Sequence, residues 1–92
     1  MTKLFILKMT EIAISGVATH EDELFILNIF DDGTFVIKPN ETNFFEIFTN
    51  DEHVNEDVVK SLRMLMDDYK ITFYKSEEVT LLLDQIKHIA LE

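Results

Sequence analysis

Large apolar residues alternate along the first part of the chain, and β-branched residues follow them up to position 14. A period of two is typical of a strand with one buried face. We therefore expect a first strand over residues 3–14, ended by the serine–glycine pair at 15–16. A short helix is the alternative, because Phe5, Met9 and Ile12 also recur at helical spacing.

Two further apolar runs, residues 24–30 (LFILNIF) and 34–38 (TFVIK), lie on either side of the turn sequence DDG at 31–33. This arrangement predicts a hairpin, because a glycine accepts the positive φ that such turns require. Pro39 ends the second of these strands. Residues 20–23 are expected to form a polar connection before the hairpin.

The second half of the chain carries an apolar stripe at helical spacing, formed by Val54, Val58, Leu62 and Leu65. It predicts a helix that starts at a cap on Asn50 or Asp51 and runs to about Asp68. Residues 70–74 then switch to strand character. Residues 43–48 (NFFEIF) fit either a short strand or one helical turn, and their large apolar side chains need cover.

A last helix is predicted after Ser76, which can cap it, with Glu77 and Glu78 in its first turn. Its inward face is expected to consist of Val79, Leu82, Leu83, Ile86, Ile89 and Ala90. The element order is then β-β-β-α-β-α. We expect one domain over residues 1–92 of the α+β class, with a mainly antiparallel four-stranded sheet and two helices packed on it.

Charge is the strongest global feature, because 18 acids against eight bases give a formal net charge of −10. Such a surface repels nucleic acid and anionic membranes and attracts basic proteins. Thirteen of the acids lie in six short runs: Glu21-Asp22-Glu23, Asp31-Asp32, Asp51-Glu52, Glu56-Asp57, Asp67-Asp68 and Glu77-Glu78.

Most of these runs have an ordinary structural explanation, since hairpin turns and the first turns of helices favour acids. Two i,i+4 pairs, Glu56 with Lys60 and Arg63 with Asp67, are expected on the helix surface. The pair at 67–68 differs, because it falls at a helix C-terminus, where the dipole disfavours anions.

The spacing of the acids also suits a substitute for nucleic acid. Glu56 and Asp67 are 11 residues apart, which is about 17 Å along a helix. Duplex DNA presents one phosphate per roughly 3.4 Å of each strand. Carboxylates held on a stiff scaffold at such distances would draw a DNA-binding protein's lysines and arginines away from DNA. Lys60, Arg63, Lys75 and Lys87 interrupt the acidic surface.

In these paired acids, and in its compact cysteine-free chain, the sequence resembles the phage DNA-mimic anti-restriction proteins, and among them the anti-restriction nuclease proteins of T-even phages. The resemblance extends over the whole chain in size, acidity and carboxylate spacing and involves no sequence motif. It implies that the paired acids stand in for phosphates. It also implies inhibition of a modified-cytosine-dependent restriction endonuclease, binding to a histone-like nucleoid protein, or both.

Apolar residues beyond the needs of one core suggest self-association. Phe44, Phe45 and Phe48 crowd one short segment, and Leu81 falls opposite the inward stripe of the last helix. We expect a homodimer, which would extend a carboxylate track over two copies. The alternative function is a small acidic adaptor that binds partners through these apolar contacts, with the acids serving solubility.

Catalytic and metal chemistry find no support in the sequence. There is no cysteine, and His20, His53 and His88 stand on distant segments without metal-ligand spacing, so each is expected to be exposed to solvent. Two glycines allow no phosphate-binding loop. We expect no enzyme activity, no cofactor and no metal. With no apolar run long enough for a secretion signal or a membrane span, we expect a cytoplasmic protein.

Overall fold

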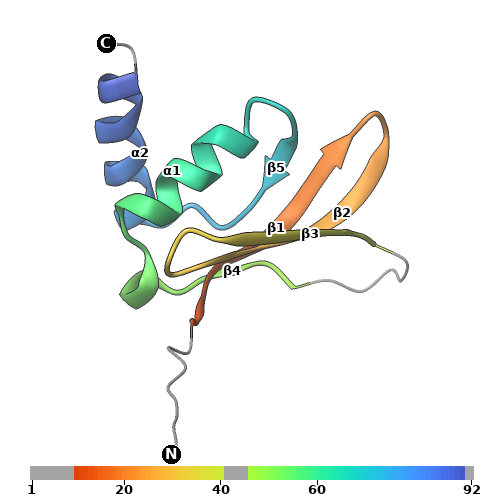
Figure 1. The fold of residues 1–92 in the computed structure, drawn as a ribbon, viewed down its shortest axis with the longest axis horizontal. Helices are drawn as coiled ribbons and strands as arrows, with labels where there is room; N and C mark the ends of the chain where they lie inside the picture. Colours follow the sequence, from red (N-terminus) through yellow and green to blue (C-terminus); the bar gives the residue numbers. More distant parts are fainter. Residues whose placement is uncertain (1–9, 41–45, 91–92) are drawn as a thin grey trace, which may run out of the picture.

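The computed structural model describes residues 10–40 and 46–90. A sheet with two helices on one side makes up the fold (Figure 1), which confirms the predicted α+β class. In chain order the elements are β1 (Ile12–His20), β2 (Glu23–Phe30), β3 (Phe35–Pro39), β4 (Phe48–Thr49), the 3₁₀ turn η1 (Asp51–His53), α1 (Glu56–Leu65), β5 (Lys70–Thr72) and α2 (Glu77–Ala90). The predicted order of strands and helices agrees with this, apart from β4 and η1.

The strands form an antiparallel sheet in the order β3-β2-β1-β4, and β5 also pairs with β1. The sheet thus has five strands instead of the predicted four, because Phe48, the last residue of the ambiguous apolar segment, forms a short strand with Thr49 beside β1. Phe44 and Phe45 of that segment lie outside the described residues. The hairpin at 31–33 is confirmed, and Gly33 has the expected positive φ of 90°.

The prediction that the first strand ends at 15–16 is wrong, since β1 continues to His20. Residues 3–9 of the predicted strand lie outside the described residues. Gly16 is needed because β5 comes very close: a Cβ at this position would be only 2.5 Å from the backbone oxygen of Thr72. The glycine that looked like a chain break is therefore the point where a neighbouring strand approaches the central one.

The N-cap of the first helix lies five residues after the earlier of the two predicted caps. Asn55 is the N-cap, and its side-chain oxygen accepts a hydrogen bond of 3.0 Å from the Val58 N–H. The predicted caps belong instead to η1, where Asn50 is the N-cap without a side-chain bond. Val54 then takes an extended conformation between the two helical segments. The helix ends at Leu65, and a turn over residues 66–68 replaces its predicted last residues.

The core lies between the sheet and the two helices. All four residues of the predicted stripe are buried, three of them on α1 and Val54 just before it, together with Val59, which the stripe did not include. On α2 the predicted inward residues Val79, Leu83 and Ile86 are buried and Leu82 is partly buried. The side chains of Ile89 and Ala90 lie outside the described part of the structure. Ile14, Leu27 and Ile29 supply the sheet side of this core.

The connection between β1 and β2 is a tight two-residue turn. His20 pairs with Glu23, and the two residues between them have positive φ values, 50° for Glu21 and 69° for Asp22. Asparagine and glycine are the residues that adopt this conformation with least strain, whereas glutamate is disfavoured there. The hairpin therefore closes at an energetic cost that the rest of the sheet offsets.

Replacing Asp22 with glycine should relieve this cost. We expect Asp22→Gly to raise the free energy of unfolding by about 0.5–1 kcal/mol, because glycine accepts positive φ without a Cβ clash. Thermal or urea unfolding followed by circular dichroism measures the change. Asp22→Ala is the matched control, since it removes the same charge and keeps a Cβ. Equal stabilisation by both variants would mean that charge, and not backbone conformation, governs this turn.

Candidate acidic binding surface

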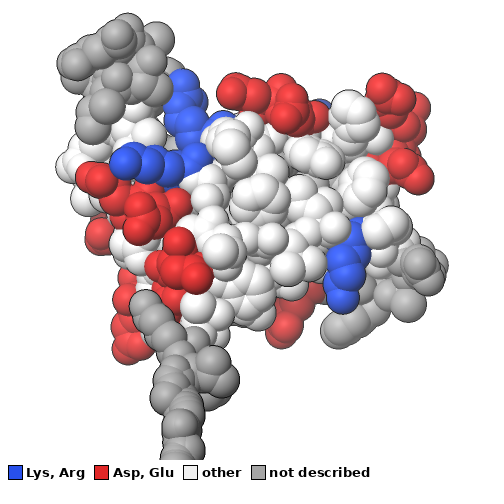
Figure 2. Space-filling model, in the orientation of Figure 1, with Lys and Arg blue, Asp and Glu red and all other residues white. Residues whose placement is uncertain are grey.

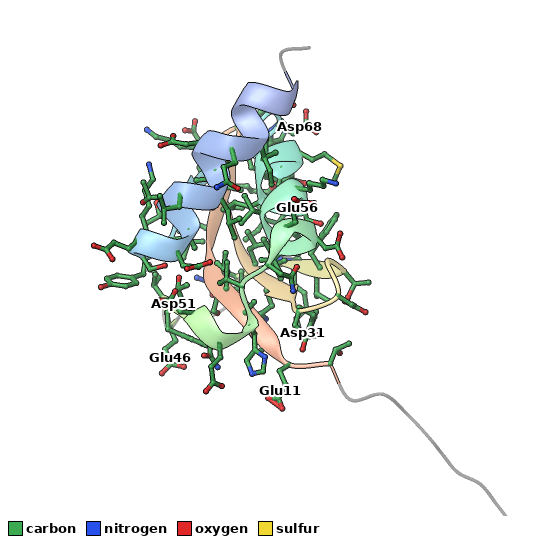
Figure 3. The ribbon with its side chains drawn as sticks, turned by 90° about the vertical axis from the view of Figure 1, so that its left-hand side faces the viewer. Glu11, Asp31, Glu46, Asp51, Glu56 and Asp68 are labelled. Atoms are coloured by element: carbon green, nitrogen blue, oxygen red, sulfur yellow. The ribbon has the colours of Figure 1, made fainter. Side chains whose placement is uncertain are left out.

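Acidic residues from five separate segments come together at one end of the molecule. This end is formed by the residue before β1, the β2–β3 turn, η1, and the N-termini of both helices. We call it the acidic end; it consists of Glu11, Asp31, Asp32, Asp51, Glu52, Glu56, Asp57, Glu77 and Glu78. Figure 3 shows Glu11, Asp31 and Asp51 around its lower part and Glu56 above them on α1.

Hydrogen bonds hold the β2–β3 turn against the start of α1. The Asn55 side chain donates to the backbone oxygen of Asp31 at 2.8 Å while it caps the helix. Further along the helix, the Ser61 hydroxyl donates to the Gly33 carbonyl. Gly33 lies directly against Asp57, so a Cβ at Gly33 would be 3.2 Å from that residue. The acids of the turn and those of the first helical turn are thus fixed relative to one another.

A second set of bonds joins η1 to the start of α2. The Ser76 hydroxyl donates to Asp51 Oδ1 at 2.6 Å and accepts from the Val79 N–H at 3.3 Å. Ser76 is therefore the helix cap that the sequence predicted, and it is buried. This contact ties the pair Asp51-Glu52 to the pair Glu77-Glu78, although 25 residues separate Ser76 from Asp51.

Several of these carboxylates have structural partners of their own. Asp32 Oδ1 accepts from the backbone N–H and the hydroxyl of Thr34, which stabilises the turn. Asp31 Oδ2 lies 3.6 Å from His53 Nδ1. His53 is only 26% exposed, so the expectation that it faces solvent freely is wrong. His88 lies outside the part of α2 whose side chains are described.

The remaining acids of this end point toward water. Glu52, Glu56, Asp57, Glu77 and Glu78 are all exposed. Four of them occupy the first turns of α1 and α2, where the helix dipole favours negative charge. Glu56 also forms the predicted pair with Lys60 at 3.7 Å. Between described residues there are three ion pairs, and the other two involve histidine.

The other predicted acids form a smaller group at the opposite end of α1. We call it the far acidic group; it consists of Glu21, Asp22, Glu23, Asp67 and Asp68. His20 connects its two segments, because its Nδ1 lies 3.1 Å from the backbone oxygen of Asp68 and its ring packs on Tyr69. In Figure 3, Asp68 lies at the top, away from the acidic end.

The thirteen predicted acids therefore divide between two surfaces and do not form one unbroken row. Lys60 and Arg63 lie on α1 between them. The predicted ion pair between Arg63 and Asp67 does not form among the described residues, because the helix ends before Asp67. Figure 2 shows acidic side chains around the margin of one broad face whose centre is uncharged.

Sequence reasoning missed one member of the acidic end, Glu11. It is isolated in the sequence and reaches this end only through the fold, where the Asp31 N–H donates to the Glu11 carbonyl at 2.8 Å. No local pattern signals this contact. Glu46 is also isolated, and its carbonyl accepts from the Ser15 hydroxyl at 3.3 Å, beside the middle of β1 and away from the acidic end.

The residues proposed for self-association are on different elements. Leu81 on α2 is 58% exposed, and Phe48 on β4 is 36% exposed. No helix among the described residues is long and apolar enough to cross a membrane. Within the same residues, no three His, Asp or Glu side chains converge closely enough to hold a metal ion. Comparison with known protein families, curated proteins and solved structures finds no match to this chain.

The bond between Ser76 and Asp51 offers a test of how firmly the acidic end is built. We expect Ser76→Ala to lower the free energy of unfolding by about 1–2 kcal/mol, because it removes the α2 cap and leaves Asp51 without this donor. Urea unfolding of Ser76→Ala, Asp51→Ala and the double variant gives the coupling energy. Additive effects would show that the contact does not join the two segments energetically.

The excess negative charge should lower stability in dilute salt. We expect the melting temperature to rise by a few degrees between about 0.01 M and about 0.15 M NaCl, since the screening length falls from roughly 30 Å to roughly 8 Å. Differential scanning calorimetry measures it. A variant with Glu52, Glu56, Asp57, Glu77 and Glu78 changed to their amides is the control and should respond less. A melting temperature independent of salt would contradict strong self-repulsion.

Proposed function

We propose that this chain is a DNA-mimic inhibitor that binds a basic protein through its acidic end and occupies the site where nucleic-acid phosphates would lie. The observation that supports this most is the presence of nine carboxylates from five segments on one end of a hydrogen-bonded scaffold. A partner with clustered lysines and arginines would gain the electrostatic attraction that it normally gains from a phosphate backbone.

Rigidity supports this proposal over a general solubilising role for the acids. A flexible acidic tail loses conformational entropy when it binds, whereas charges on a prearranged scaffold lose little. Here the turn at 31–33, η1 and both helix starts are joined by side-chain hydrogen bonds from Asn55, Ser61 and Ser76. The exposed acids next to these residues therefore keep a fixed arrangement relative to one another.

The far acidic group extends the negative surface along the molecule. The ten residues of α1 span about 15 Å, a distance that covers four to five phosphates of one DNA strand at roughly 3.4 Å each. A protein that binds along a duplex could contact both groups. Lys60 and Arg63 between them would then face the partner's own acidic residues or the gap between its basic side chains.

The resemblance to phage anti-restriction proteins gives two partner classes for the test. One is a modified-cytosine-dependent restriction endonuclease, and the other is a histone-like nucleoid protein. Both bind DNA phosphates with basic side chains, so both suit an acidic competitor. Inhibition would counter host defence in the first case and relieve gene silencing in the second.

An apolar adaptor is the second candidate function, and exposed apolar side chains favour it. Leu81, Tyr74 and Met64 are each more than half exposed, on α2, beside its start and on α1. Binding through such residues would depend little on salt, whereas binding through carboxylates weakens steeply as salt rises. The salt dependence of binding therefore separates the two functions.

Neutralising the acidic end should weaken inhibition much more than neutralising the far acidic group. The first variant changes Glu52, Glu56, Asp57, Glu77 and Glu78 to their amides and leaves the structural acids Asp31, Asp32 and Asp51 intact. We expect it to lose at least tenfold in affinity for the basic partner. The measurement is the displacement of a purified histone-like nucleoid protein, or a modified-cytosine-dependent endonuclease, from fluorescent duplex DNA.

The matched control changes Glu21, Asp22, Glu23, Asp67 and Asp68 in the same way. Both variants move the formal net charge from −10 to −5, so a difference between them reports position and not total charge. Circular dichroism verifies that each is folded. Equal losses of affinity in the two variants would mean that total charge, and not the position of the acidic end, governs binding. If the unmodified protein displaces neither partner, and host proteins captured on it elute with neither salt nor duplex DNA, the mimic function is wrong.

A further inference from the structure

Strand β3 forms an outer edge of the sheet, and its exposed side chains are largely apolar. It pairs with β2 on one side, and among the described residues no strand pairs with its other side. Phe35 is 37% exposed and Val36 is 41% exposed. Exposed apolar edges are templates for pairing with another strand, and proteins usually protect them with charges, prolines or bulges. Here Lys38 and Pro39 are the protective residues within the strand.

The hydrogen-bond pattern shows which backbone groups of β3 point outward. Phe30 N–H donates to the Thr34 carbonyl, and Asn40 N–H donates to the Leu24 carbonyl. Even-numbered residues of the strand therefore turn their N–H and C=O groups toward β2, since these directions alternate along an antiparallel strand. Phe35 and Ile37 consequently present both groups outward, and Pro39 presents a carbonyl without an N–H.

We propose that this edge binds the β3 edge of a second copy of the chain, antiparallel, with Val36 on the two-fold axis. In this register Phe35 of each copy faces Ile37 of the other, and the two pairs exchange four backbone hydrogen bonds. Shifting the axis to Ile37 would place Phe35 opposite Pro39, which has no N–H to donate. The proline thus favours one register, and the pairing closes on itself instead of continuing as a fibre.

The side chains suit this register. Val36 meets its own copy in a non-hydrogen-bonded pair, where side chains come closest, and Phe35 packs beside Ile37. Lys38 faces Thr34 of the other copy and is diagonal to that copy's Asp32, so opposite charges meet at both ends of the paired strands. Figure 2 views the side of the molecule where β3 runs and shows uncharged atoms at its centre.

Apart from Asp32, which lies diagonal to Lys38, this dimer involves neither Leu81 nor the residues of the acidic end, so the inference does not depend on the proposed function. The acidic end begins at the β2–β3 turn, just before β3, and antiparallel pairing directs the two acidic ends away from each other. That geometry limits repulsion between two copies that each carry a formal charge of −10. Added salt should strengthen the pairing by screening this repulsion, the opposite of its effect on a basic partner.

Single cysteines test the register directly, because the chain has no cysteine of its own. The proposed pairing places the two Val36 Cα atoms about 4.5 Å apart, within the range of about 4.4–6.8 Å that a disulfide requires. We expect Val36→Cys to form a disulfide-linked dimer in air without catalyst. Lys38→Cys is the matched control on the same strand, since its two copies would lie about 13 Å apart. Non-reducing electrophoresis measures both, with Leu81→Cys as a second control.

Sedimentation equilibrium in about 0.5 M NaCl tests whether the unmodified protein self-associates. Protein concentrations from about 10 to about 500 μM suit a small, weak interface. We expect a reversible monomer–dimer equilibrium that Val36→Glu and Ile37→Pro shift to monomer. The Ile37 N–H points outward, so proline there spares the bonds to β2. Circular dichroism checks that both variants are folded. If Ile37→Pro is unfolded, the test rests on Val36→Glu alone.

Leu81→Glu makes the same apolar-to-acid change on α2 and should leave the dimer intact. The inference is overturned if the unmodified protein stays monomeric over the whole range. It is also overturned if Leu81→Glu dissociates the dimer while Val36→Glu does not, or if Lys38→Cys links as readily as Val36→Cys.

Discussion

Both helices begin at the same end of the molecule, and the unpaired N–H groups of their first turns determine what that end can contain. These groups need acceptors and favour negative charge. The chain supplies Asn55 and Ser76 as caps and places two acids directly after each. The η1 turn and the β2–β3 turn are then bonded to the same two caps, which brings their aspartates to the same place. The requirement for helix caps is therefore enough to bring these acids to one end, whatever their function.

That construction concentrates like charge, and the fold has to withstand it. The buried residues of α1 and α2 pack against Ile14, Leu27 and Ile29 of the sheet, so the helix starts cannot move apart without opening the core. Gly16 lets β5, which connects α1 to α2, approach the central strand. Local dipole attraction and the core together offset the repulsion, and the carboxylates that remain exposed are available to a partner.

Local patterns predicted much of this fold, because periodicity and turn chemistry act between residues close in sequence. The stripe from Val54 to Leu65, the Gly33 turn and the Ser76 cap all belong to this class. The predictions are wrong where contacts between segments distant in the sequence determine the structure. Ser15-Gly16 continues a strand because β2 pairs along one side of β1 while β4 and β5 pair along the other side, and Asn55 is the cap because it also bonds the β2–β3 turn. Glu11 belongs to the acidic end only through a backbone contact that no sequence spacing reveals.

The distribution of charge also explains why β3 could remain a usable edge. Most acids lie at turns and helix N-termini, which favour acidic residues. The strand between the β2–β3 turn and Pro39 carries only Lys38 as a charged residue. A chain of this net charge would resist association with itself if its acids were spread evenly. Because they are confined to the ends of the elements, one strand edge stays nearly uncharged and can approach its own copy. Ionic strength then acts with opposite sign on the two surfaces: it weakens contacts made by the acidic end and strengthens contacts made by the edge.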